Sequence, residues 1–227
     1  MSHVLTMSTL LGASAFLAAA SASQGAILAE FKFDGGSAAS TDVDANSTAS
    51  NFTTSNTAAA NVSGSGNAFV RSTATGSTAA DAAADTDFFT FTLTGNGGEL
   101  LNLSSLVLDL GASVNTATGG TVPFDNTVFV SSGASQIGTA SSSTVNNTNG
   151  APGFPTTGAS FDLSSAEFQG LSSITFKFAF ADSADQDAAI NRLDNVIVNG
   201  TTGTAVPEPM FLALAPMTLA AMTRRRR

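Results

Sequence analysis

A strict alternation of apolar and polar side chains constrains the fold of this chain more than any other feature. Residues 171–181 carry an apolar side chain at every second position, at Ile174, Phe176, Phe178 and Phe180. Residues 88–94 alternate threonine with Phe and Leu in the same way. Because successive side chains of a strand point to opposite faces of a sheet, each segment predicts a strand with one buried and one solvated face. Such strands bury their apolar faces against a second layer, so the pattern predicts an all-β protein.

Weaker versions of the same pattern recur between turns rich in Gly, Asn, Ser and Thr. Together with the two segments above, they predict eight strands, over Ala26–Phe33, Ala68–Ser72, Phe88–Thr94, Leu101–Leu110, Thr127–Ser131, Ser160–Leu163, Leu171–Ala181 and Arg192–Asn199. This number of strands, without Cys or Trp, favours a jelly-roll-like β-sandwich over an immunoglobulin-like one. Residues 37–67 and 132–158 are poor in apolar side chains, and we expect them to be long, partly disordered loops.

The composition excludes several classes of chemistry. The 227 residues contain no Cys, Trp or Tyr, one His and a net charge of −9. Without Cys there is no disulfide, thiolate nucleophile or Cys/His zinc site. If His3 is removed with a leader, no imidazole remains for a Ser-His-Asp triad or a His general base. An acidic chain without clustered Lys and Arg also argues against nucleic acid as a partner.

The first 22 residues predict a secretory signal peptide. Val4 to Ala20 are nearly all apolar or small, and Ala20-Ser21-Ala22 offers the small residues that signal peptidase requires. The start, Met1-Ser2-His3, lacks the usual Lys or Arg. A buried N-terminal helix is the alternative. We expect the export machinery and signal peptidase to act here, which leaves residues 23–204 as the passenger domain.

Residues 205–227 form a second distinct segment. Pro207-Glu208-Pro209 precedes an uncharged stretch over 210–223, and the chain ends in Arg224, Arg225, Arg226 and Arg227. An apolar helix followed by arginines is a stop-transfer signal, because guanidinium groups stay on the cytoplasmic side. The stretch is shorter than the roughly 20 residues of a full span, so a core helix is the alternative.

In this order, the three features resemble the PEP-CTERM sorting signal of exported bacterial proteins. The resemblance implies that a membrane-embedded exosortase recognises Pro207, Glu208 and Pro209, cleaves nearby, and releases the protein to the cell surface or medium. The tail would hold the precursor in the inner membrane until then. Such proteins are associated with bacteria that produce exopolysaccharide and biofilm. The passenger, opening on Glu30–Asp34 and closing on Arg192–Val196, is similar to jelly-roll domains attached to such tails.

Acidic residues are the only candidate metal ligands. Two clusters flank predicted strands, Asp182, Asp185 and Asp187 in one and Asp81, Asp85 and Asp87 in the other. Their i, i+2 carboxylates suit the oxygen coordination of calcium, although Asp is also an ordinary turn residue. In carbohydrate-binding jelly rolls a calcium ion often bridges the first and last strands. Glu30 or Asp34, together with Asp194, would supply the ligands of such an ion here. The alternative is a salt bridge from Asp194 to Arg192 or Lys32.

We therefore expect a non-enzymatic structural or adhesive protein of the cell surface or extracellular matrix, with extracellular polysaccharide as a candidate partner and calcium as the one candidate cofactor. A calcium-dependent carbohydrate-binding module is the alternative. A hydrolase that uses two Asp residues is a third, disfavoured reading, because so acidic a chain contains chance carboxylate pairs. The absence of Trp and Tyr, which commonly stack on sugars, counts against both alternatives.

Overall fold

The computed structural model describes residues 25–42, 44–55, 60–63, 67–70, 78–84, 88–115, 125–133, 135–143, 145–147, 157–182 and 189–204. The predicted signal peptide (1–22) and the tail (205–227), with Pro207, Glu208, Pro209 and Arg224 to Arg227, lie outside these ranges. Within them, none of the helices is long and apolar enough to cross a membrane.

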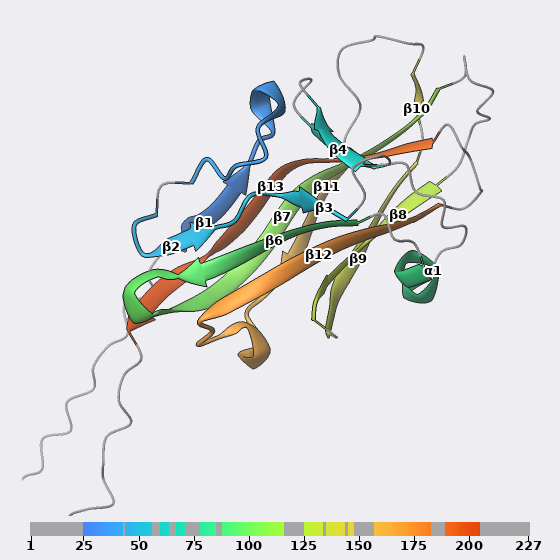
Figure 1. The fold of residues 1–227 in the computed structure, drawn as a ribbon. Helices are drawn as coiled ribbons and strands as arrows, with labels where there is room; N and C mark the ends of the chain where they lie inside the picture. Colours follow the sequence, from blue (N-terminus) through green and yellow to red (C-terminus); the bar gives the residue numbers. More distant parts are fainter. Residues whose placement is uncertain are drawn as a thin grey trace, which may run out of the picture.

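The described residues form an all-β sandwich, as the alternation predicts (Figure 1). One sheet has the order β10-β7-β13-β5-β4, with β1 paired to β13 and β11 to β7. Its strands are β1 (Ala26–Phe31), β4 (Ala60–Ser63), β5 (Asn67–Val70), β7 (Glu99–Asn115), β10 (Val145–Asn147), β11 (Thr157–Asp162) and β13 (Ala189–Thr204). All its pairings are antiparallel except that of β10 with β7.

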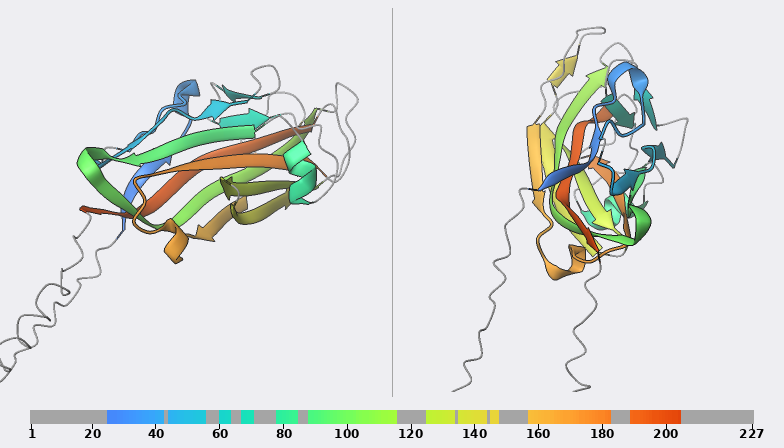
Figure 2. Two further views of the ribbon diagram at one scale, coloured as in Figure 1. Left: turned by 60° about the horizontal axis from the view of Figure 1, so that its bottom comes forward. Right: turned by 90° about the vertical axis from the view of Figure 1, so that its left-hand side faces the viewer.

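The second sheet is antiparallel throughout and has the order β2-β6-β12-β8-β9, with β3 paired to β6. Its strands are β2 (Ser47–Ala49), β3 (Thr53–Thr54), β6 (Phe88–Gly95), β8 (Asp125–Ser132), β9 (Ser135–Ser143) and β12 (Ser173–Asp182). One helix, α1 (Ala79–Ala84), and the 3₁₀ turns η1 (Asp34–Gly36), η2 (Asn96–Gly98) and η4 (Ala166–Phe168) complete the described elements. Figure 2 shows the two layers from further directions.

Phenylalanine fills the space between the layers. The alternating side chains of β6 and β12 are buried as predicted, at Phe89, Phe91, Leu93, Ile174, Phe176, Phe178 and Phe180. The Phe91 ring centroid lies 4.7 Å from that of Phe31 on the opposite sheet and 5.1 Å from that of Phe176 on the neighbouring strand. Since each fully buried Phe contributes about 1.5–3 kcal/mol, this cluster stabilises the fold without disulfides.

All eight predicted strands are present, but the expectation of two long loops is wrong for the described residues. The range 37–67 contains β2, β3 and β4, and the range 132–158 contains β9 and β10. These strands are short or rich in Ser and Thr, and they join the sheets through backbone pairing to β5, β6, β7 and β8. A polar edge strand needs few apolar residues: β9 packs Ile137 against the core, and the connection between β2 and β3 places Phe52 in it.

Candidate functional site

The calcium cluster predicted at Asp81, Asp85 and Asp87 contains a helix cap in its described part. The Asp81 carboxylate accepts hydrogen bonds from the backbone N–H of Thr78 at 2.8 Å and from its hydroxyl at 2.7 Å. The Thr78 hydroxyl in turn accepts from the backbone N–H of Asp81 at 3.2 Å. This reciprocal pair is a capping box at the start of α1. Asp85 and Asp87 lie outside the described residues, so calcium at this cluster stays a prediction.

The second cluster follows the end of β12. Asp182 is the last residue of that strand and pairs with Asn126 of β8. Asp185 and Asp187 lie outside the described residues, and a site formed by the three also stays a prediction.

The third predicted set of calcium ligands consists of Glu30, Asp34 and Asp194, and Glu30 and Asp194 contact different residues. The Glu30 carboxylate forms an ion pair with Lys32 at 3.1 Å and accepts a hydrogen bond from the Thr41 hydroxyl at 3.0 Å. Asp194 instead lies opposite Asp109 in the pairing of β13 with β7. Lys32 therefore forms its salt bridge with Glu30 and not with Asp194, which was the predicted alternative.

Burial raises the pKa of Asp194, and the nearby carboxylates of Asp109 and Asp34 add to the rise. A hydrogen bond from the backbone N–H of Asn195, at 2.8 Å, opposes it. The carboxylates of Asp34 and Asp194 therefore repel each other across this part of the fold, and a calcium ion between them stays a prediction. However, the described residues contain no group of three or more acidic, His or Cys side chains arranged to hold a metal ion.

Arg192 lies two residues before Asp194 on β13. Burial lowers the pKa of its guanidinium to about 10, so Arg192 remains a cation at neutral pH.

Hydroxyl groups line most of the outer face of the second sheet that α1 leaves open. We call this surface the hydroxyl face; its side chains alternate with the buried ones and are partly or largely exposed, at Thr48, Thr90, Thr92, Thr94, Thr127, Ser131, Thr139, Ser141, Ser173 and Thr175. Several are bonded in cross-strand pairs: Thr92 to Thr175 at 2.8 Å, and Thr127 to Ser141 at 2.8 Å. The register therefore holds these hydroxyls in a fixed array.

One cation lies within this array. The ammonium group of Lys177 lies 4.0 Å from the centroid of the Phe88 ring, a cation–π contact. Among the described side chains on the strands of the hydroxyl face, Lys177 is the one charged group. At one end of the face α1 packs Ala82 against Phe129, Ala179 and Ala181.

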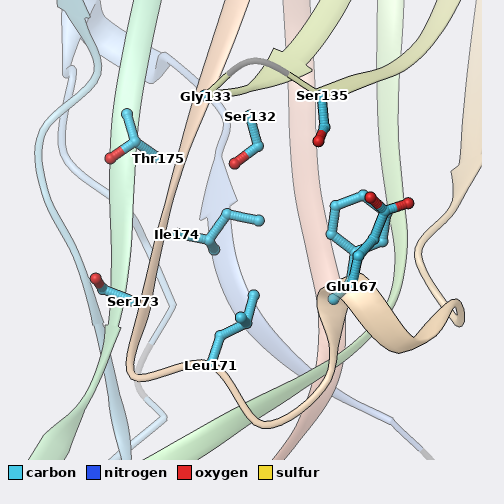
Figure 3. A pocket seen from close by; sticks show the side chains of 9 residues that line it. Ser132, Gly133, Ser135, Glu167, Leu171, Ser173, Ile174 and Thr175 are labelled. Atoms are coloured by element: carbon cyan, nitrogen blue, oxygen red, sulfur yellow. The ribbon is translucent and has the colours of Figure 1, made fainter.

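A pocket of about 440 Å³ opens at one end of the same sheet (Figure 3). Its walls come from the β8–β9 turn, the η4 segment and the start of β12, and it is lined by Ser132, Gly133, Ser135, Glu167, Phe168, Leu171, Ser173, Ile174 and Thr175. In Figure 3 the side chains of Ser132, Ile174 and Leu171 lie one below another, with the Glu167 carboxylate to their right. Phe168 and Ile174 are each 6% exposed and give the pocket an apolar floor.

The pocket exists because β12 extends further than one of its neighbours. Pairing of β12 with β6 extends to Ser173, whereas pairing with β8 begins only at Phe176. The backbone N–H of Gly95 in β6 donates to the carbonyl of Ser172. Backbone groups alternate in direction along a strand, so those of Ser173 and Thr175 point away from β6, toward the pocket.

Sequence reasoning missed this pocket. Glu167 stands alone in a loop between two predicted strands, and no spacing rule links it to the distant serines of the β8–β9 turn.

No family model matches the sequence, and no curated protein does either. Among solved structures, the fold is similar to the arabinose-bound MgGH51 α-L-arabinofuranosidase, with a TM-score of 0.36, 15% identity, and coverage of 76% of this chain and 27% of that one. It is similar to the CBM22-1–CBM22-2 tandem domain of Xyn10C from Paenibacillus barcinonensis, with a TM-score of 0.30, 13% identity, and coverage of 86% and 50%. The Stig cyclase Fisc from Fischerella sp. TAU gives a TM-score of 0.29, 10% identity, and coverage of 81% and 92%. The chain thus spans about a quarter of the arabinofuranosidase, and likenesses this weak carry no functional argument.

Proposed function

We propose that this chain is an exported, non-catalytic protein that adheres to extracellular polysaccharide through its hydroxyl face. The observation that carries the proposal is the array of exposed hydroxyls that the register of β6, β12, β8 and β9 holds in place. A polysaccharide presents repeated hydroxyls of its own, each both donor and acceptor, which a Ser and Thr surface can match. Individually weak contacts along a polymer add up through multivalency.

Export belongs to the same proposal. It is supported by the signal-peptide pattern over 1–22 and by the PEP-CTERM-like tail over 205–227, whose resemblance implies an exosortase and a surface destination. A protein sorted in this way meets exopolysaccharide at the site of its release. The expected destination of the protein and the chemistry of its hydroxyl face therefore point to the same partner.

The non-catalytic part of the proposal rests on the carboxylates. Glycoside hydrolysis normally needs two of them across a cleft, as acid and as base or nucleophile. The described lining of the pocket supplies one, Glu167. Asp109 and Asp194 do lie opposite each other, but on the outer side of the other sheet, where Asp109 accepts a hydrogen bond from the Asn195 side chain at 2.8 Å.

Co-sedimentation with insoluble polysaccharide from the cells that make the protein tests the proposal. We expect the full chain to bind, and the double change Thr92→Val and Thr175→Val to weaken binding because it removes a bonded hydroxyl pair at nearly constant volume. The matched control changes Thr157 and Thr204, exposed on the other sheet, to Val. Equal binding by both double variants would contradict a role for the hydroxyl face.

The calcium-dependent alternative has a separate readout. If a bound ion organises the site, a chelator abolishes polysaccharide binding by the unaltered chain. We expect binding to survive chelation, because the hydroxyl array is held by backbone pairing and side-chain hydrogen bonds.

A further inference from the structure

The pocket beside β12 offers a different chemistry from the hydroxyl face. It combines three kinds of group: serine hydroxyls at Ser132 and Ser135, one carboxylate at Glu167, and an apolar floor at Phe168 and Ile174. Its volume of about 440 Å³ falls within the range of about 300–1,000 Å³ that is typical of small-molecule sites.

The charges of the lining restrict the ligand. The described lining contains no Lys, Arg or His, so it offers no counter-charge to an anion. A single carboxylate also supplies too few ligands for calcium. That ion takes six to eight oxygens, usually from several carboxylates and carbonyls. An ionised carboxylate accepts hydrogen bonds only, so Glu167 calls for a ligand that donates. The Ser165 hydroxyl donates to one of its oxygens at 3.2 Å, which orients the group.

The unpaired edge of β12 adds donors and acceptors in fixed positions. The backbone groups of Ser173 point toward the pocket beyond the last pair of β12 with β8, which joins Phe176 to Ser132, whereas those of Thr175 lie at the end of that ladder beside Gly133. A ligand that bonds here replaces water on groups that the sheet already orders, so little conformational entropy is lost.

We propose that the pocket binds one neutral sugar ring, through neighbouring hydroxyls that donate to Glu167 and bond to the β12 edge at Ser173. One face of the ring, which carries C–H groups, lies on Phe168 and Ile174. The β8–β9 turn borders the pocket on one side and η4 on the other, so we expect it to take a chain end or a branch unit rather than the middle of a polymer. This inference rests on the proposed function and adds to it a site that selects one sugar unit.

Titration of the isotope-labelled full chain with free monosaccharides tests the proposal. The probes are glucose, galactose, mannose and arabinose, with glucosamine as the charged comparison. We expect at least one neutral sugar to shift the amide NMR signals of Gly133, Ser173 and Thr175 in a saturable way, with a dissociation constant on the order of 1 mM for so few contacts.

The decisive variant is Glu167→Gln, which keeps the size of an exposed side chain and removes its charge. Because hydrogen bonds to charged groups are strong, we expect it to weaken sugar binding about tenfold or more. Glu30→Gln is the matched control, since Glu30 lies on β1 of the other sheet, and it should leave sugar binding unchanged. Ser132→Ala should weaken binding by a smaller factor.

The same variants, tested on polysaccharide, separate the two proposals. If the chain binds polysaccharide but no neutral sugar shifts the pocket signals, or if only glucosamine does, the pocket inference is overturned and the proposed function stands. The inference also fails if Glu167→Gln binds neutral sugar as well as Glu30→Gln does. If sugars bind in the pocket but the chain does not co-sediment with polysaccharide, the proposed adhesive function is overturned and the inferred sugar site stands.

Discussion

At the scale of single residues, Gly138 on β9 is held by the packing of the core. A Cβ atom at this position would overlap the ring of Phe161, which is itself only 7% exposed. Gly203 on β13 has open space at the same point. The two glycines therefore differ in the room for a side chain.

We expect Gly138→Ala to lower the free energy of unfolding by about 1–3 kcal/mol, because the ring of Phe161 must move within a packed core. Gly203→Ala is the control and should stay within about 0.5 kcal/mol. Urea denaturation with an unchanged slope provides the measurement. Equal stabilities of the two variants would show that β9 does not pack on Phe161 in this way.

Asp194 gives a prediction on pH. Its folded pKa is raised by burial and by Asp109 and Asp34, so ionisation costs more in the folded state than in the unfolded one. Its contribution is neutral while both states are protonated and becomes destabilising as pH rises from the usual carboxyl range through the raised folded pKa. We expect Asp194→Asn to raise the melting temperature at pH 7 and to leave it unchanged at pH 3.

Asn can still accept the bond from the Asn195 backbone, which makes the substitution conservative. Asp162→Asn is the control, because the pKa of Asp162 is shifted in the opposite direction. Hydrogen bonds from Ser164 lower the pKa of that exposed carboxyl, so its ionised form is the favoured one in the folded state. If Asp194→Asn destabilised the protein at neutral pH, the charge of Asp194 would be engaged in an attraction, as a bound cation would provide.

At the scale of elements, α1 depends on its ends. A helix of six residues is far below the length at which helices form alone in water, so it relies on the Thr78–Asp81 box and on the packing of Ala82. We expect Thr78→Ala to cost about 1 kcal/mol of local stability. Hydrogen exchange at the amide of Ala82, which bonds to the Thr78 carbonyl at 3.2 Å, should speed up.

The effect of that change should be local, because α1 covers only one end of the outer sheet face. Strand amides of β6 should keep their protection, and Thr78→Ser, which retains the hydroxyl, should restore slow exchange. Faster exchange across β6 and β12 together would instead make α1 part of the cooperative unit of the sandwich.

The strands show how far the sequence predicts this fold. Period-two segments with Phe or Leu on one side, such as 88–94 and 171–181, are explained by burial alone, and they became β6 and β12. β9 carries mainly Ser, Thr and Gly with only Ile137 and Ala140 against the core, so its hydrophobic pattern is too weak to detect. Its place depends on backbone pairing with β8, which a single-segment pattern does not contain.

The candidate site was less predictable, for a physical reason. The pocket results from a difference in strand ends, since β12 continues to Ser173 while β8 stops at Ser132. Glu167 and Ser135 line one pocket only because the β8–β9 turn and η4 lie at the same end of the sheet. Local spacing of carboxylates predicts calcium clusters, by contrast, and for Asp81 the structure shows helix capping.

At the scale of the whole molecule, both ends of the described sandwich lie side by side. Ala26 pairs with Gly200, so the chain enters through β1 and leaves through β13 in adjacent strands of one sheet (Figure 1). Cutting at residues before β1 or after β13 breaks no sheet pairing of the described residues. The body of the protein can therefore lose both terminal segments without losing its core.

Intact mass of the protein recovered from cells and from medium tests this processing. We expect the released form to lack roughly the first 22 and the last 18 to 20 residues, with cleavage near Ala22 and near Pro207-Glu208-Pro209. Glu208→Ala should block the second cleavage and keep the protein in the membrane fraction, while Glu99→Ala, in the sandwich, should be processed normally. A complete C-terminus on every recovered molecule would contradict the sorting part of the proposal and leave the tail as a membrane anchor, with the adhesive face still open to its own test.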